Sequence, residues 1–182
     1  MGNRILTTAV LLIIVAGTFS CKDWFADLFE DEAYTLTRED YTGNQIRTDG
    51  YYYSYYKSGS DLVGVTIFYR NGVVIDGTGG RSLSEFDEVF SNGTFYNNNK
   101  NNKDIWGIFK VVNNEVMIER AIADGLMHRL AFIDYGKILN DTTIHIYKNK
   151  ESYGNDVTTV KDDTLHFKQF SPKPDSTNVF IK

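Results

Sequence analysis

The side chains that most often perform catalysis or bind metals are few in this chain and lie far apart in the sequence. There is one cysteine, Cys21, and there are three histidines, His128, His145 and His166. The histidines lack the i, i+2 or i, i+4 spacing that brings two imidazoles to one metal ion. No GxSxG elbow, P-loop ending or pair of carboxylates on adjoining strands accompanies them. The sequence therefore predicts no catalytic site, no metal and no cofactor, although a dispersed active site would leave no local motif.

A run of tyrosines offers binding surface instead. Side chains on a strand alternate between its faces, so Tyr51, Tyr53 and Tyr55 share one face, and Tyr52 and Tyr56 share the other. A strand with two aromatic faces suits a barrel wall, with a core or an apolar ligand inside and a stacking surface outside. The candidate ligand-binding residues are Tyr51, Tyr53 and Tyr55, together with Trp106 from a later strand, and plain packing in the core is the alternative.

A glycine-rich segment, Gly77–Ser82, lies between a predicted strand and a predicted helix. Backbone N–H groups and a helix start can hold an anion in that setting. The segment lacks the Gly-Lys-Ser/Thr ending of a P-loop and the GxGxxG spacing. We expect a connecting loop here, with anion binding as the alternative.

The N-terminus has the plan of a secretory signal. Arg4 precedes an uncharged, largely apolar run over residues 5–19, and Ser20 closes the run before Cys21. The run is shorter than the roughly 20 apolar residues that a membrane helix needs. A lone thiol in an exported protein needs a reason, and this one stands where the apolar run ends. We expect residues 1–20 to be a signal peptide and Cys21 to begin the mature protein.

Residues 18–21, Thr-Phe-Ser-Cys, resemble the lipobox of bacterial lipoproteins, in which the cysteine receives a thioether-linked diacylglycerol. The resemblance implies that Cys21 carries acyl chains such as palmitate. Two or three chains at one site give durable membrane attachment, whereas a single chain is marginal. Lys22-Asp23 is similar to the export tag of Bacteroidetes-type surface lipoproteins. Together these features predict a lipid anchor in the cell outer membrane, with the protein facing the periplasm or the cell surface.

Composition limits the partners and the fold class. The net charge is −5 and no cluster of Lys and Arg is present, which argues against nucleic acid as a partner. Residues 46–182 are rich in Tyr, Phe, Val, Ile and Thr, which favour strands. Tight turns such as Asn71-Gly72 and Asn113-Asn114 divide them. We predict an all-β domain over residues 46–182, an antiparallel barrel or sandwich, after an acidic tether at residues 21–45.

One short helix is expected near residues 83–90. Ser82 and Glu85 have the spacing of a capping box, and apolar residues recur on one face until Asn92-Gly93 ends the helix.

Several segments are similar to a group of Bacteroidetes-type lipoproteins, of uncharacterised activity, with a small lipocalin-like β domain. They are residues 46–56, 69–74, 106–119, 136–144 and 173–182. The resemblance implies a lipocalin-like meander and brings no activity with it. We expect a noncatalytic envelope module that binds a small molecule, a lipid or a glycan. The alternatives are an envelope hydrolase with a dispersed site and a structural subunit of an outer-membrane complex.

Overall fold

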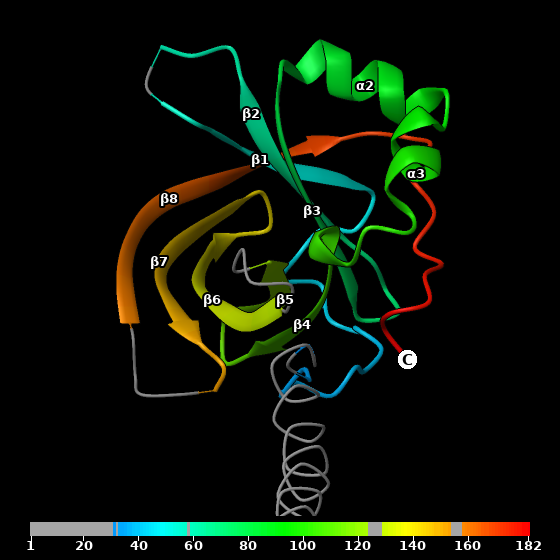
Figure 1. The fold of residues 1–182 in the computed structure, drawn as a ribbon. Helices are drawn as coiled ribbons and strands as arrows, with labels where there is room; N and C mark the ends of the chain where they lie inside the picture. The colour runs from blue at the N-terminus through cyan, green and yellow to red at the C-terminus, as the bar shows by residue number, and fades with distance from the viewer. Residues whose placement is uncertain (1–30, 32, 58, 124–128, 154–157) are drawn as a thin grey trace, which may run out of the picture.

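The computed structural model describes residues 31, 33–57, 59–123, 129–153 and 158–182. Eight strands form a closed antiparallel barrel in which each strand pairs with the next and β8 pairs with β1 (Figure 1). The strands are β1 (Gly50–Tyr55), β2 (Val63–Phe68), β3 (Val73–Arg81), β4 (Trp106–Val112), β5 (Glu115–Ala123), β6 (Arg129–Asn140), β7 (Thr143–Glu151) and β8 (Thr158–Gln169). This confirms the all-β barrel, and its up-and-down strand order is the meander that eight-stranded lipocalin barrels have.

The long connection between β3 and β4 holds the helices. They are α2 (Leu83–Ser91), α3 (Thr94–Asn99) and the 3₁₀ turn η1 (Lys103–Ile105). The predicted helix is α2, and its capping box is present, with the Ser82 N–H donating to Glu85 Oε2 over 2.8 Å. Helix α3 was not predicted from the sequence. None of the described helices is long and apolar enough to cross a membrane.

The prediction of a connecting loop at residues 77–82 was wrong, because residues 77–81 continue strand β3. Gly77 pairs with Val65, and a Cβ at Gly77 would lie 2.8 Å from the Val65 side chain and 3.2 Å from Phe95. A glycine is therefore favoured at this position of the strand, because a larger residue would meet the ring of Phe95 on α3. Only Ser82 remains as a connection, and its N–H is already used by the helix cap.

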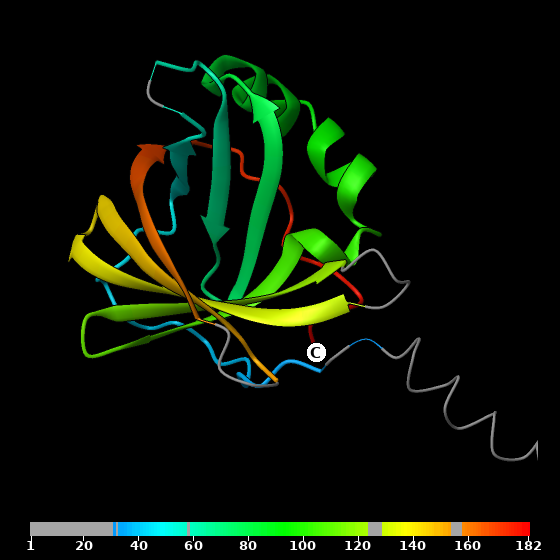
Figure 2. The ribbon, with the colours of Figure 1, turned by 60° about the vertical axis from the view of Figure 1, so that its left-hand side comes forward.

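Two apolar clusters lie on the two sides of the barrel wall. One fills the interior and includes Tyr52, Phe68 and Phe109. The other lies on the outer face of β1–β4, where Phe86, Phe90 and the C-terminal segment cover it. Figure 2 shows α2 and α3 outside the barrel, beside β2 and β3, with the C-terminal segment descending next to them. The alternation of strand residues thus serves two cores, one inside and one outside the wall.

The N-terminal segment packs along the outside of the barrel from residue 33, earlier than the domain boundary expected at residue 46. Residues 33–41, which we call the strap, lie against β4 and β5. Tyr34 donates its hydroxyl proton to the carbonyl of Trp106 over 3.0 Å. At the far end of the strap, the Tyr41 N–H donates to the carbonyl of Arg70 over 2.7 Å.

One buried carboxylate holds the strap. Glu119 on β5 is fully buried and accepts the backbone N–H groups of Thr35 and Leu36 over 2.9 and 2.6 Å. The hydroxyls of Thr35 and Ser152 also donate to it, over 2.8 and 2.6 Å. Four donors on one carboxylate compensate for burying its charge.

The C-terminal segment is held by hydrogen bonds to its backbone. Tyr69 and Tyr96 donate hydroxyl protons to the carbonyls of Pro174 and Thr177 over 2.7 and 2.9 Å. Lys173 donates to the carbonyls of Thr48 and Phe68, and burial lowers the pKa of its ammonium group to about 8. These contacts fasten the chain end to the barrel.

Candidate functional site

The interior of the barrel has an apolar end and a charged end. At the apolar end, Tyr52 packs edge-on against Phe68 with ring centroids 5.4 Å apart, and Phe68 packs against Phe109 at 4.9 Å. Ile46 and Tyr41, from the segment before β1, pack against this cluster. This end is filled by the chain's own side chains.

The charged end holds an ion cluster whose members come from different strands. Arg120 on β5 contacts Asp76 on β3 and, over 2.7 Å, Asp134 on β6. Lys161 on β8 contacts the other oxygen of Asp134, also over 2.7 Å. The side-chain amide of Asn149 on β7 donates to that same oxygen over 2.8 Å. Closure of the barrel is what brings these five strands to one centre.

The two paired carboxyl groups respond differently to burial. Burial raises the pKa of the Asp134 carboxyl, but Arg120, Lys161 and Asn149 outweigh it and hold that pKa below its ordinary value. Burial also raises the pKa of Asp76, and there the attraction of Arg120 does not compensate, so the pKa stays above its ordinary value. The cluster is therefore one in which Asp134 is firmly ionised and Asp76 takes up a proton more readily.

A cavity of about 100 Å³ adjoins this cluster inside the barrel. Ser54, Gly64 and Asp163 line it together with the charged cluster. Asp163 on β8 is half-buried, and among the residues that the structure describes no side chain makes a hydrogen bond or ion pair with it. Gly64 leaves room, since a Cβ there would have its nearest neighbours at 3.9 and 4.0 Å. The cavity thus contains a carboxylate that is free to bind something else.

This site was not predicted from the sequence, although alternation carries a signal for it. In β5, Val116 and Ile118 point inward, so Arg120 must point inward as well. The same parity turns Asp76 inward from Val74 on β3. Charged residues at inward positions of several strands would have indicated a polar centre.

The predicted tyrosine site divides between the outer core and an open groove. Tyr51 is fully buried and donates its hydroxyl proton to Asp87 over 2.8 Å. Tyr53 is half-buried, and Tyr55 is 49% exposed with its ring 5.7 Å from that of Tyr53. Tyr55 lines an open hollow of about 500 Å³ at the start of α2, next to Lys168, which pairs with Asp87 over 2.5 Å. Of the three predicted tyrosines, only Tyr53 and Tyr55 present ring surface to solvent.

Trp106, the fourth predicted binding residue, is not at this groove. Its side chain is fully buried on the outer face of β4, with the ring of Tyr96 edge-on at 6.4 Å. Its indole N–H is buried and has no hydrogen-bond partner in the described part of the chain. The ring therefore contributes to packing beneath the helices.

The two histidines in the described regions point outward, as alternation predicts. His145 Nε2 lies 2.9 Å from the carboxylate of Asp162, and His166 is exposed beside the ring of Tyr53. His128 and Cys21 lie outside the described residues. In the regions that the structure describes, no three His, Cys, Asp or Glu side chains are grouped to hold a metal ion.

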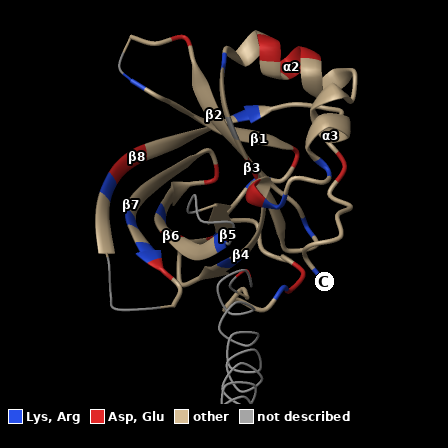
Figure 3. Ribbon diagram, in the orientation of Figure 1, with Lys and Arg blue, Asp and Glu red and all other residues tan. Residues whose placement is uncertain are grey.

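Figure 3 shows acidic residues gathered on α2 and charges of both signs along β7 and β8.

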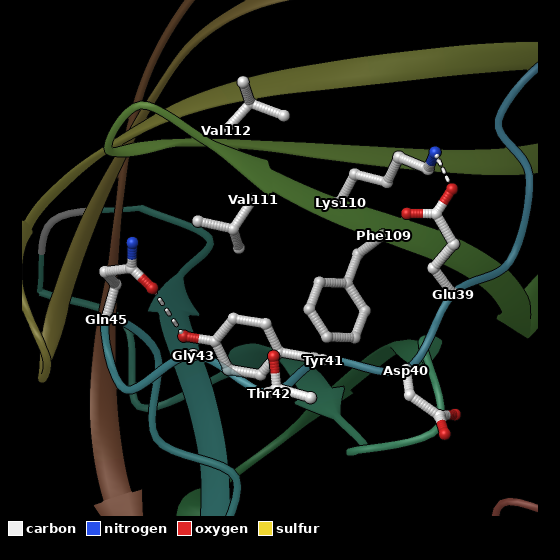
Figure 4. A pocket seen from close by; sticks show the side chains of 10 residues that line it. All are labelled: Glu39, Asp40, Tyr41, Thr42, Gly43, Gln45, Phe109, Lys110, Val111 and Val112. Atoms are coloured by element: carbon white, nitrogen blue, oxygen red, sulfur yellow. Dashed lines mark hydrogen bonds and ion pairs between the residues drawn. The ribbon is translucent and has the colours of Figure 1, made fainter.

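A third hollow, of about 250 Å³, lies between residues 39–45 and β4 (Figure 4). The ring of Tyr41 packs edge-on against Phe109 with centroids 5.6 Å apart and forms its apolar floor. Lys110 and Glu39 pair at its rim over 2.6 Å, and the hydroxyl of Tyr41 donates to the side chain of Gln45. Its charged pair and tyrosine hydroxyl are thus already engaged with the chain's own groups, unlike Asp163 in the interior cavity.

Comparison with known proteins adds no relative. No protein-family model, no curated protein and no solved structure matches this chain. The function is therefore argued from the geometry of the interior cavity.

Proposed function

We propose that this chain is an exported, lipid-anchored envelope protein of the Bacteroidetes type that binds a small polar ligand inside the charged end of its barrel and performs no catalysis. The observation that carries the proposal is the interior cavity with its unpartnered carboxylate, Asp163. Tyr53 and Tyr55 remain candidates for a second contact on the outside of the wall.

Energetics supports a binding role for the cavity. Replacing a buried ion cluster by apolar side chains is often neutral or stabilising by about 1–4 kcal/mol. The other end of the same barrel is filled by aromatic and aliphatic side chains, so an apolar filling is compatible with this wall. The charged end combines polar side chains with an empty volume. A binding site needs this combination of a concavity and a few placed polar groups.

The ion pairs of Asp134 argue against its use as a general base. A general base must be free to accept a proton and have a pKa near the working pH. Asp134 is engaged by three donors, and its pKa is held below the ordinary range. The groups of the cluster are placed to hold charge in position.

Lipidation is tested by metabolic labelling. Labelled palmitate should enter the wild-type chain and not Cys21→Ala, because the thioether needs the thiol. Ser20→Ala keeps a small residue before the cleavage point and should retain the label. Equal label in wild type and Cys21→Ala would exclude an anchor at this position.

Binding is tested by recovering the ligand. The full chain, purified from its native membranes and then denatured, should release a small polar compound that mass spectrometry detects. Gly64→Val should release little of it, because the added side chain occupies the cavity without meeting backbone. Gly64→Ala adds one methyl group at ordinary van der Waals distance from its neighbours and is the matched control. Equal recovery from the valine variant, or no compound from any variant, would contradict the interior site.

A further inference from the structure

We infer that the ligand presents a primary ammonium group to Asp163, an inference that rests on the proposed binding function. The charged end contains three carboxylates, Asp76, Asp134 and Asp163, and two cations, Arg120 and Lys161. With all five ionised the balance is one negative charge. The cluster is complete without Asp163, so this carboxylate is where a positive group would be held.

The ion pairs show why an anion is a poorer fit. Arg120 already contacts Asp76 and Asp134, and Lys161 contacts Asp134. An anionic ligand would have to compete with these carboxylates for the cations and would face Asp163 as well. A cationic ligand needs no bond in the cluster to break.

Hydroxyl groups near Asp163 favour an ammonium group over a metal ion. Tyr53 pairs with His166 across β1 and β8, which places Ser54 diagonally from Asp163 on the inner face. Thr66 on β2 also lines the cavity. An R–NH₃⁺ group has three N–H donors and can use one carboxylate and two hydroxyl oxygens. A metal ion would lack a second free carboxylate.

The size of the cavity limits the occupant. About 100 Å³ holds roughly three water molecules at about 30 Å³ each, or an amine with a similarly small number of non-hydrogen atoms. Only the ammonium end of a larger molecule would enter.

Asp31, just before the strap, lies at the charged end of the barrel. Asp31 pairs with Lys103 over 2.9 Å and approaches Arg129, the first residue of β6, to 3.6 Å. Asp134 follows five residues later, about 17 Å along the strand. Cys21 precedes Asp31 by ten residues, a reach of at most about 33–36 Å. The ammonium group could thus belong to a free small amine or to the head group of an ethanolamine lipid.

The experiment titrates ethanolamine into the full mature chain held in nanodiscs of phosphatidylglycerol, which has no amine, and follows binding by calorimetry. Saturable binding is expected, with the affinity reduced at least tenfold in Asp163→Asn. Asp162→Asn is the matched control, because Asp162 precedes Asp163 on the same strand and faces solvent. Ethylene glycol, which has no ammonium group, should not bind.

Repeating the titration in nanodiscs that contain phosphatidylethanolamine identifies the source of the amine. A tenfold weaker apparent affinity for free ethanolamine there would mean that the lipid head group occupies the cavity, and an unchanged affinity would assign the cavity to a free amine. No ethanolamine binding in phosphatidylglycerol, or equal affinity in Asp163→Asn, overturns the inference. Recovery of a ligand without an amine overturns it too, but leaves the proposed interior site standing.

Discussion

Replacing Arg120 with methionine should lower the free energy of unfolding by about 3–5 kcal/mol at pH 7, the largest effect that we expect from a single side chain of the charged end. Arg120 is 11% exposed and contacts both Asp76 and Asp134. Methionine fills similar volume but leaves two buried carboxylates without their shared counter-ion, which is costly in a poorly solvated interior. Urea unfolding followed by circular dichroism measures the loss.

The pH dependence of that loss separates charge from packing. Without Arg120, burial is opposed less at both carboxyl groups, so both folded-state pKa values rise, and that of Asp76 rises further above its value in the unfolded chain. A raised folded pKa stabilises the folded state below the unfolded value and loses that contribution as the pH rises. The deficit of Arg120→Met should therefore shrink as the pH falls from 7 towards 4. A deficit that stays constant over this range would mean that packing, and not charge, is the cause.

Arg129→Met is the matched control. Arg129 also has two carboxylate partners, Asp104 at 2.5 Å and Asp31 at 3.6 Å, but it is 30% exposed and lies outside the barrel. Exposed pairs contribute about 1 kcal/mol or less, so this variant should lose no more than that and show little dependence on pH. Similar losses in the two variants would refute the special role of the interior cluster.

Local sequence patterns predicted the features that depend only on residues close together in the chain. Alternation placed Tyr51 and Tyr52 on opposite sides of the wall, and the structure puts them in the outer and inner cores respectively. The pair Asn113-Asn114 joins β4 to β5 with both φ angles positive, at 49° and 68°, as a tight hairpin requires. The Ser82 cap depends only on residues within one turn of helix.

The elements that were missed depend on packing and strand pairing with other elements. Residues 94–99 read TFYNNN, a sequence with low helix propensity, and they form α3 because Phe95 is buried against Phe86 and Phe90. Strand β8 begins at Thr158, in the polar stretch before Leu165 and Phe167, because β7 extends far enough to pair with it. Helix propensity and strand alternation do not register these packing contacts.

The candidate site shows the same limit more sharply. A single strand reveals that Arg120 points inward, but only closure of the barrel shows that Asp76 and Asp134 meet it and that Asp163 is left over. Likewise, the tyrosines and Trp106 looked alike in sequence. The helices that cover Tyr51 and Trp106, but not Tyr55, separate them.

Glu119→Gln should release the strap while the barrel stays folded, at a cost of about 2–4 kcal/mol to the strap's local stability. Three donors meet Glu119 Oε1, and the N–H of Leu36 meets Oε2 over 2.6 Å. A glutamine side chain keeps one acceptor oxygen. Its NH₂ group replaces the second oxygen and would point at an N–H or O–H group that also donates. The backbone N–H of Leu36 or of Thr35 then loses its partner in a partly buried place.

Hydrogen exchange and limited proteolysis measure the release. The amides of Thr35 and Leu36 should exchange faster in Glu119→Gln, and trypsin should cleave after Arg38, which the wild-type strap holds through a 2.8 Å hydrogen bond to the carbonyl of Asn71. Glu115→Gln is the matched control, because Glu115 lies on the same strand and face but is exposed and accepts only the hydroxyl of Tyr147. Arg38 as resistant in Glu119→Gln as in Glu115→Gln would show that the strap is held by its other contacts. Cleavage confined to Glu119→Gln would instead identify this buried carboxylate as the link that holds the N-terminal segment on the barrel.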